Sequence, residues 1–225
     1  MHPRVMRETL SPVRPRVVYS ITPIYVSPST AFDSRSRWSM VEQRLGPRYH
    51  ALVQFVALLR GVNVGGRTIP MAQVRDCVRD LGVDSVSTVL QTGNIRLESD
   101  RDSVELKRTL ETALGERFSY WAHVHLLEMS SLRRIVEGSP FGTSEPDRHS
   151  YVVFVDGGCE REIVAEVTDL IGADEAVELG DGVLYWGVPK GRTLESSFAK
   201  HLTKAKYRDF HTTRNITTLR KIIGP

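Results

Sequence analysis

The segment that decides the fold is Leu58-Leu59-Arg60-Gly61-Val62-Asn63-Val64-Gly65-Gly66, in which an apolar run ends abruptly in a glycine-rich loop. The apolar run extends back to Val53 and predicts a buried strand. Glycines let a backbone approach a ligand closely, and Arg60 and Asn63 can donate hydrogen bonds to an anion or a carbonyl. The segment therefore predicts a strand that leads into a binding loop.

The hydrophobic pattern after this loop alternates between helical and strand spacing. We expect a helix over residues 71–81, then strands over 86–91 and 95–98 around the turn Thr92-Gly93-Asn94. A second helix carries Leu106, Leu110, Ala113 and Leu114, and a fourth strand covers residues 121–127. The order of elements is βαββαβ.

The same order recurs after a helix over residues 131–137 and a linker over 140–148. Its four strands cover residues 151–156, 176–179, 183–188 and 208–213. Its first helix contains Ile163 and Val167, its second runs from Leu194 to Ala205, and a terminal helix begins near Ile216. We therefore expect an α+β fold of two tandem ferredoxin-like (βαββαβ) alpha-beta plaits with a C-terminal helix.

The domain boundaries follow from this pattern. We expect a first ferredoxin-like domain over residues 51–128, a connecting helix and linker over 129–149, and a second domain over 150–225. Residues 1–50 hold six of the eleven prolines and eight arginines but no lysine, and they show no apolar periodicity. This part is either a disordered tail or the product of a start placed upstream of the true one.

Composition limits the class of protein. No apolar run approaches the roughly 18 residues of a membrane span, and the two cysteines, Cys77 and Cys159, form no disulfide framework. We expect a cytoplasmic chain without a membrane partner. The loop after Arg60 has neither the Walker sequence nor the Gly-x-Gly-x-x-Gly spacing of a dinucleotide fold, so no cofactor is expected.

The predicted topology places two loops together. Right-handed crossovers make the first two strands of a βαββαβ unit parallel, with the third strand antiparallel between them. The loop after the first strand and the following hairpin then lie at the same end of the sheet. The predicted ligand-binding residues at this end are Arg60, Asn63, Gly65, Gly66, Gln91 and Asn94.

A second candidate is the C-terminal segment, residues 189–225, which carries nine Lys and Arg against two acidic residues. Residues 51–188 carry thirteen Lys and Arg against twenty-two Asp and Glu. The basic segment therefore either faces an anion or attracts the acidic part of the chain. Lys190, Arg214 and Asn215 would add countercharge to the loop edge if the fold brings them near. The alternative makes Asn215 a helix N-cap and the lysines a solvated face.

Other side chains invite chemical interpretations. His123 and His125 point to one strand face with the spacing of a metal pair, but no third ligand is identifiable, so packing or solvation is favoured and no metal is expected. Cys159 follows two glycines at a helix start, without a nearby histidine to activate it. Tyr185 and Trp186 suit a protein core, although a partly exposed pair could stack on a nucleotide base.

Four segments together resemble a bacterial family, the one named domain of unknown function 1697: residues 58–66, Gln91-Thr92-Gly93-Asn94, Val188-Pro189-Lys190-Gly191 and Thr213-Arg214-Asn215. The resemblance runs from about Val53 to the C-terminus. It implies a pair of ferredoxin-like plaits, and it implies no activity.

These observations favour a protein that binds a small anionic or nucleotide-like ligand at the glycine-rich loop edge. Two alternatives stay open. One is a transferase or hydrolase acting on a phosphorylated substrate, for which the sequence assigns no base or nucleophile. The other is nucleic-acid binding through the basic C-terminal segment. The sequence leaves open whether the chain is an enzyme, and what its oligomeric state is.

Overall fold

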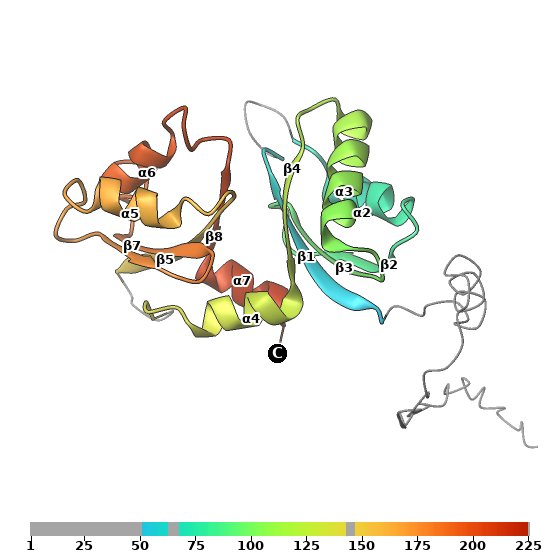
Figure 1. The fold of residues 1–225 in the computed structure, drawn as a ribbon, viewed down its shortest axis with the longest axis horizontal. Helices are drawn as coiled ribbons and strands as arrows, with labels where there is room; N and C mark the ends of the chain where they lie inside the picture. Colours follow the sequence, from blue (N-terminus) through green and yellow to red (C-terminus); the bar gives the residue numbers. More distant parts are fainter. Residues whose placement is uncertain (1–50, 63–67, 143–146, 225) are drawn as a thin grey trace, which may run out of the picture. The chain divides into compact units, whose positions relative to one another are not determined.

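The computed structural model describes residues 51–62, 68–142 and 147–224, and residues Tyr49–Pro225 form one compact unit (Figure 1). The predicted tail over residues 1–50 lies outside the described residues, as do the predicted site residues Asn63, Gly65 and Gly66. Among the residues described, no helix is long and apolar enough to cross a membrane.

The first sheet contains β1 (Val53–Arg60), β2 (Asp84–Thr88), β3 (Asn94–Ser99) and β4 (His123–Glu128) in the order β2-β3-β1-β4. All neighbouring strands are antiparallel. Helices α2 (Met71–Arg79) and α3 (Ser103–Phe118) cover one face of this sheet (Figure 1). This is the predicted βαββαβ unit.

Residues 55–59 of β1 are all apolar because both faces of the strand are covered there. Phe55, Ala57 and Leu59 pack into the core beneath α2 and α3. Val56 and Leu58 point to the opposite face, where they join a second core. Side chains of a strand alternate between faces, so burial of both faces requires the continuous apolar run seen in the sequence.

The second sheet repeats the arrangement. It contains β5 (Arg148–Val155), β6 (Ala176–Leu179), β7 (Val183–Pro189) and β8 (His211–Asn215) in the order β6-β7-β5-β8. Helices α5 (Glu160–Val167) and α6 (Ser197–Leu202) pack on one face of it through a third core. The expected α+β fold with two βαββαβ sheets is confirmed.

Helices α4 (Met129–Glu137) and α7 (Ile216–Ile223) lie side by side (Figure 1). Leu132 of α4 and Leu219 of α7 are fully buried in the second core, together with Leu58 of the first sheet and Phe154 of the second. This shared core joins the two sheets, and α7 is the predicted C-terminal helix.

Several element boundaries differ from the prediction, and two of the differences have a visible cause. The second helix of the repeat was expected from Leu194 to Ala205, but Leu194 is 90% exposed and α6 begins only at Ser197. The Ser196 hydroxyl accepts a hydrogen bond from the Ala199 N–H, which caps the helix there. The following strand begins at His211 rather than at residue 208, because residues 203–210 form turns.

A candidate anion site between strands β1 and β8

Residues from the two ends of the described chain line one crevice. Its volume is about 320 Å³. The first sheet contributes the end of β1 and the β2–β3 turn, and the second sheet contributes β8. The lining residues are Leu59, Arg60, Gly61, Val62 and Thr92 on one side, and His211, Thr212, Thr213 and Arg214 on the other.

The predicted meeting of the first loop with the hairpin is confirmed where the residues are described. The Leu59 N–H donates to the Gly93 carbonyl at 2.7 Å. Gly93 has a φ of +72°, and a Cβ there would lie 3.0 Å from the Val62 side chain and 3.1 Å from the Leu59 Cβ. Glycine is therefore required both for the turn and for the close approach of these segments.

Arg214 links the two sheets. Its Nε donates to Asn94 Oδ1 at 2.7 Å, and its Nη2 donates to the carbonyls of Leu59 at 2.7 Å and Gly93 at 3.4 Å. Its Nη1 donates to the Thr212 hydroxyl at 2.8 Å and the Thr213 carbonyl at 2.9 Å. A guanidinium has five N–H donors, so Arg214 uses all of them on neutral acceptors.

The charge of Arg214 is not neutralised by any carboxylate in the described part of the chain. Burial lowers the pKa of its guanidinium to about 10, which leaves it charged at neutral pH. A buried cation without a counterion is unfavourable, and it creates a positive potential in the space beside it. That space is the crevice.

Asn94 fixes the orientation of Arg214. The Asn94 side chain is fully buried, and its Nδ2 donates to the Val89 carbonyl at 2.9 Å and the Thr92 hydroxyl at 2.8 Å. Both amide hydrogens are thus used, and Oδ1 is turned toward Arg214. Asn94 therefore holds the cation in place rather than presenting a free donor to the crevice.

Arg60 stands at the rim of the crevice and is partly exposed. Its Nη1 lies 3.2 Å from Asp209 Oδ1, and its Nη2 contacts the Arg208 carbonyl. Desolvation alone would raise the pKa of Asp209, but hydrogen bonds from Arg60 and Arg208 lower it overall. Arg60 therefore has a charged partner at the rim, and its partly exposed side chain lines the crevice.

Strand β8 lies at the edge of its sheet. The Asp156 N–H donates to the Phe210 carbonyl at 2.8 Å, so the residue before β8 turns its polar groups toward the neighbouring strand. In an antiparallel strand the N–H and C=O groups of one residue point to the same side, and those of the next residue point to the opposite side. His211 and Thr213 therefore turn their backbone N–H groups away from β5 to the side of the crevice, where no described residue accepts a hydrogen bond from them.

His211 was missed by the sequence reasoning. Its Nδ1 lies 2.9 Å from the Tyr207 carbonyl oxygen, and its Nε2 has no hydrogen-bond partner among the described residues. Burial lowers the pKa of the imidazole, and the charge of Arg60 lowers it further. No motif marked this residue, because it becomes notable only through its place beside Arg60 and Arg214.

Residues 52–185 match the family model described as "Protein of unknown function (DUF1697)". The chain belongs to the DUF1697 family. Its structure is similar to that of the conserved bacterial protein SP0830 from Streptococcus pneumoniae, with a TM-score of 0.65 and 25% identity over 77% of this chain and 98% of that one. The similarity supports the two-sheet fold.

An unknown protein from Galdieria sulphuraria also aligns, at 14% identity over 73% of this chain and 98% of that one, but its TM-score is 0.21. That score is too low to support an argument. No curated protein matches this DUF1697 chain.

Two predicted site residues of this DUF1697 protein lie elsewhere. Lys190 and Asn215 line a different cavity of about 280 Å³, together with Arg148, His149 and Ser150. Asn215 Oδ1 accepts a hydrogen bond from the Thr217 N–H at 2.8 Å, so Asn215 is the N-cap of α7. Gln91 is exposed in the turn before Gly93. The structure thus joins Arg60, Asn94 and Arg214 but not Lys190 and Asn215.

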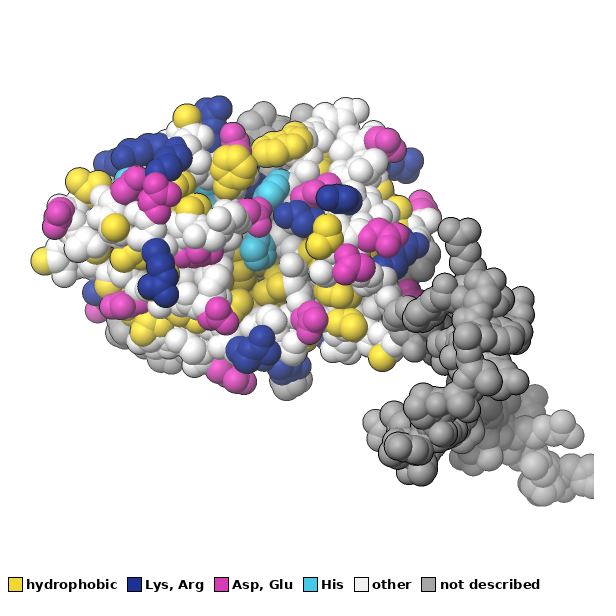
Figure 2. All heavy atoms as spheres, in the orientation of Figure 1, with side chains coloured by type: hydrophobic (Ala, Val, Ile, Leu, Met, Phe, Trp, Pro, Cys, Tyr) yellow, Lys and Arg dark blue, Asp and Glu magenta, His cyan; other side chains and the backbone are white. Residues whose placement is uncertain are grey.

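Part of the basic C-terminal segment is paired with carboxylates. Lys206 lies 2.5 Å from Glu162 and 3.1 Å from Glu166, and Arg208 lies 3.4 Å from Asp209. Cationic and acidic side chains are interspersed on the face shown in Figure 2. The described segment therefore presents mixed charge on this face rather than a continuous basic patch.

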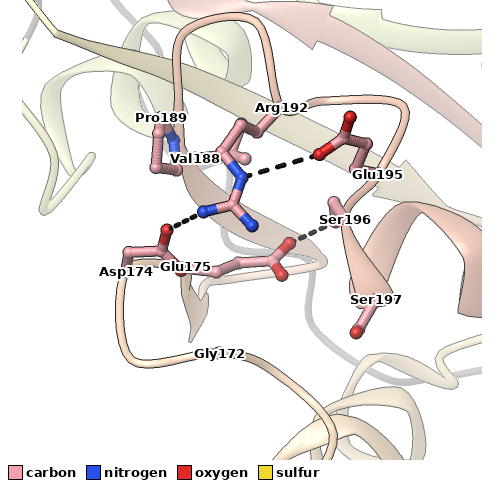
Figure 3. Close-up of a pocket in the computed structure, with 9 residues that line it drawn as sticks. All are labelled: Gly172, Asp174, Glu175, Val188, Pro189, Arg192, Glu195, Ser196 and Ser197. Carbon is pink, nitrogen blue, oxygen red and sulfur yellow. Dashed lines mark hydrogen bonds and ion pairs between the residues drawn. The ribbon is translucent and has the colours of Figure 1, made fainter.

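A third cavity, of about 100 Å³, is lined by Arg192 and its carboxylate neighbours (Figure 3). Arg192 lies 2.7 Å from Asp174 and 3.7 Å from Glu195. Glu175 accepts hydrogen bonds from Trp186 Nε1, at 2.7 Å, and from the Ser196 hydroxyl. Arg192 is paired with two carboxylates here, so this cavity has no uncompensated cation like Arg214.

The paired histidines pack against the second sheet, as favoured from the sequence. His123 Nε2 pairs with Asp156 Oδ2, and His125 Nδ1 lies 3.3 Å from Asp156 Oδ1. Although burial opposes it, hydrogen bonding from both histidines and the nearby Lys107 hold the pKa of Asp156 far below its usual value. No metal-binding group of three or more His, Cys, Asp or Glu occurs among the described residues.

The cysteines and aromatic residues have structural roles. Cys77 is buried in the first core, and burial raises the pKa of the Cys159 thiol, which opposes formation of a nucleophilic thiolate. Tyr185 and Trp186 are both buried. They belong to the cores of this protein, so they do not form an exposed stacking surface.

Proposed function

We propose that the crevice between β1 and β8 binds a small anionic ligand that carries phosphate or a nucleotide-like group. The observation that supports this most strongly is the buried, uncompensated charge of Arg214 beside an open cavity. An anion in the crevice would supply the missing counterion. The positive potential of Arg214 is present before a ligand arrives, and it would favour binding of the anion.

The chemistry of the crevice suits an oxyanion. Arg60 can supply a charged donor at the rim, and the open edge of β8 offers the N–H groups of His211 and Thr213. Arg214 acts through its charge alone because all five of its donors are occupied. The ligand contacts thus come from Arg60 and the backbone, while Arg214 supplies the potential.

The size of the crevice favours a small molecule. Its volume of about 320 Å³ is at the lower end of the 300–1,000 Å³ typical of small-ligand sites. A nucleic acid would need an extended basic surface, whereas Lys206 and Arg192 are paired with local carboxylates.

The test is calorimetry and thermal denaturation of the full chain with pyrophosphate, AMP and a 12-nucleotide RNA. We expect pyrophosphate or AMP to bind saturably and to stabilise the fold, by about 2.7 kcal/mol at a hundredfold over the dissociation constant. Arg60→Gln removes a donor and frees the Asp209 carboxylate to repel the anion. Affinity should then fall at least fivefold, about 1 kcal/mol.

The matched control is Arg192→Gln, because Arg192 is an ion-paired arginine in a different cavity. This variant should bind the anion as the natural chain does. Equal losses in both variants, or no saturable binding of either small anion, would overturn the proposal. Binding of the RNA alone, weakened steeply by salt and unchanged in Arg60→Gln, would support the nucleic-acid alternative instead.

A further inference from the structure

We propose that His211 is a proton-accepting ligand residue of the crevice, which takes up a proton as the anion binds and donates it as a hydrogen bond from Nε2. This inference rests on the proposed function and extends it from the location of the site to its coupling with pH.

The tautomer of His211 follows from its one hydrogen bond. A carbonyl oxygen only accepts, so the Nδ1 atom that faces the Tyr207 carbonyl at 2.9 Å carries a hydrogen. In the neutral ring the lone pair is then on Nε2. That atom has no protein partner in the described part of the chain, and the residue lines the crevice. His211 therefore presents a proton acceptor, not a donor, to an incoming ligand.

Desolvation, more than the surrounding charges, favours the neutral ring before binding. Arg60 opposes a second positive charge on His211, Asp209 favours it, and desolvation is the largest influence and opposes it. Arg214 faces the same crevice with its charge uncompensated. Asp156, at the end of the neighbouring strand, is occupied by His123 and His125. An oxyanion in the crevice would add a negative charge beside the ring and so favour the protonated form of His211.

An anion next to Nε2 attracts a proton to the ring and gains a charged donor in return. The histidine pKa is below 6.5 in the free protein and rises in the complex. Affinity therefore increases as the pH falls from the bound-state pKa toward the free-state pKa. Within that window the histidine contributes up to a tenfold change in affinity for each pH unit.

The experiment measures proton uptake when pyrophosphate binds to the full chain. Calorimetry between pH 6 and 8, in buffers of different ionisation enthalpy, gives the number of protons taken up. The variant His211→Asn keeps a donor near the position of Nδ1 but cannot titrate. Because pyrophosphate itself titrates, the decisive quantity is the difference between the natural chain and this variant.

The matched control is His149→Asn, in the cavity that contains Lys190. We expect proton uptake to fall in His211→Asn and to stay unchanged in His149→Asn. The ratio of affinities at pH 6 and pH 8 should be about five- to tenfold larger in the natural chain than in His211→Asn.

A direct measurement on the unmodified chain keeps the inference testable if His211→Asn does not fold. The ¹⁵N shift of His211 Nε2 should change from that of a bare nitrogen to that of a protonated one when pyrophosphate is added near pH 7. Binding with equal proton uptake in all three chains, and an unchanged Nε2 shift, would overturn the role of His211 but leave the anion site standing. An absence of binding at every pH would refute the site itself.

Discussion

Replacement of Arg214 by methionine should destabilise the fold because it removes the hydrogen bonds that link the sheets. The four shorter bonds, between 2.7 and 2.9 Å, contribute about 6 kcal/mol at about 1.5 kcal/mol each for a charged donor. Holding the guanidinium pKa near 10 instead of 12.5 costs about 3 kcal/mol, which the neutral methionine does not incur. The expected net loss is about 3 kcal/mol.

The assay is urea denaturation of the full chain, supported by thermal melting. A loss of about 3 kcal/mol corresponds to a fall in Tm of roughly 6–12 °C for a folded unit of this size. Arg214→Lys separates charge from geometry. It keeps the positive charge but loses the planar fork, so it should lose about half as much stability and bind pyrophosphate within about threefold of the natural chain.

A small effect would refute this reasoning. If Arg214→Met lowers the free energy of unfolding by less than about 1 kcal/mol, the hydrogen bonds of Arg214 do not stabilise the fold as described. If Arg214→Lys loses anion binding as completely as Arg214→Met, Arg214 contacts the ligand directly and does not act through its charge alone.

Three further outcomes follow from the structure. Asp156→Asn should lower stability at neutral pH by about 1–3 kcal/mol, because it removes the negative charge and one of the two oxygens that accept from His123 and His125, and an unchanged urea midpoint would contradict this. Since the pKa of Asp156 is depressed, the natural chain should keep this contribution at neutral pH and lose it only below the ordinary pKa of 3.8, as measured by the pH dependence of unfolding. Gly93→Ala should lose more stability than Gly182→Ala in the same denaturation assay. Both glycines have a positive φ, but of the two only Gly93 lacks space for a Cβ. Equal losses would rule out crowding at the turn.

The strand order and the meeting of two loops could be predicted because they depend on local pattern. Alternating periodicities identified the strands, and the handedness of crossovers placed Arg60 beside Gly93. The bond from the Leu59 N–H to the Gly93 carbonyl bears this out. The apolar run also predicted the strand β1, whereas the burial of both of its faces is seen only in the structure.

The role of Arg214 could not be predicted in the same way. From the sequence the last strand was expected to end at residue 213, but Arg214 lies on β8, and the Asn94 side chain that it contacts is 120 residues earlier. Which face of β8 meets the first sheet depends on the packing of α4 and α7, which no local pattern encodes. His211 was missed for the same reason.

The sequence left open whether the basic segment pairs with carboxylates of the same chain, and the structure shows such pairs for part of it. Counting charge showed an acidic body and a basic end, and mutual attraction was one of the two interpretations. The structure pairs Lys206 with Glu162 and Glu166 on α5, which lie 44 and 40 residues earlier in the chain. Long-range pairing of this kind requires the fold to be known first.

The measurement that tests the central claim most directly is a ¹H–¹⁵N correlation spectrum of the labelled full chain, titrated with pyrophosphate. An anion site in the crevice should give saturable chemical-shift changes that are largest at the backbone amides of Gly61, His211 and Thr213. Shifts concentrated at Lys190 and Asn215, or no saturable shifts, would contradict an anion site between β1 and β8.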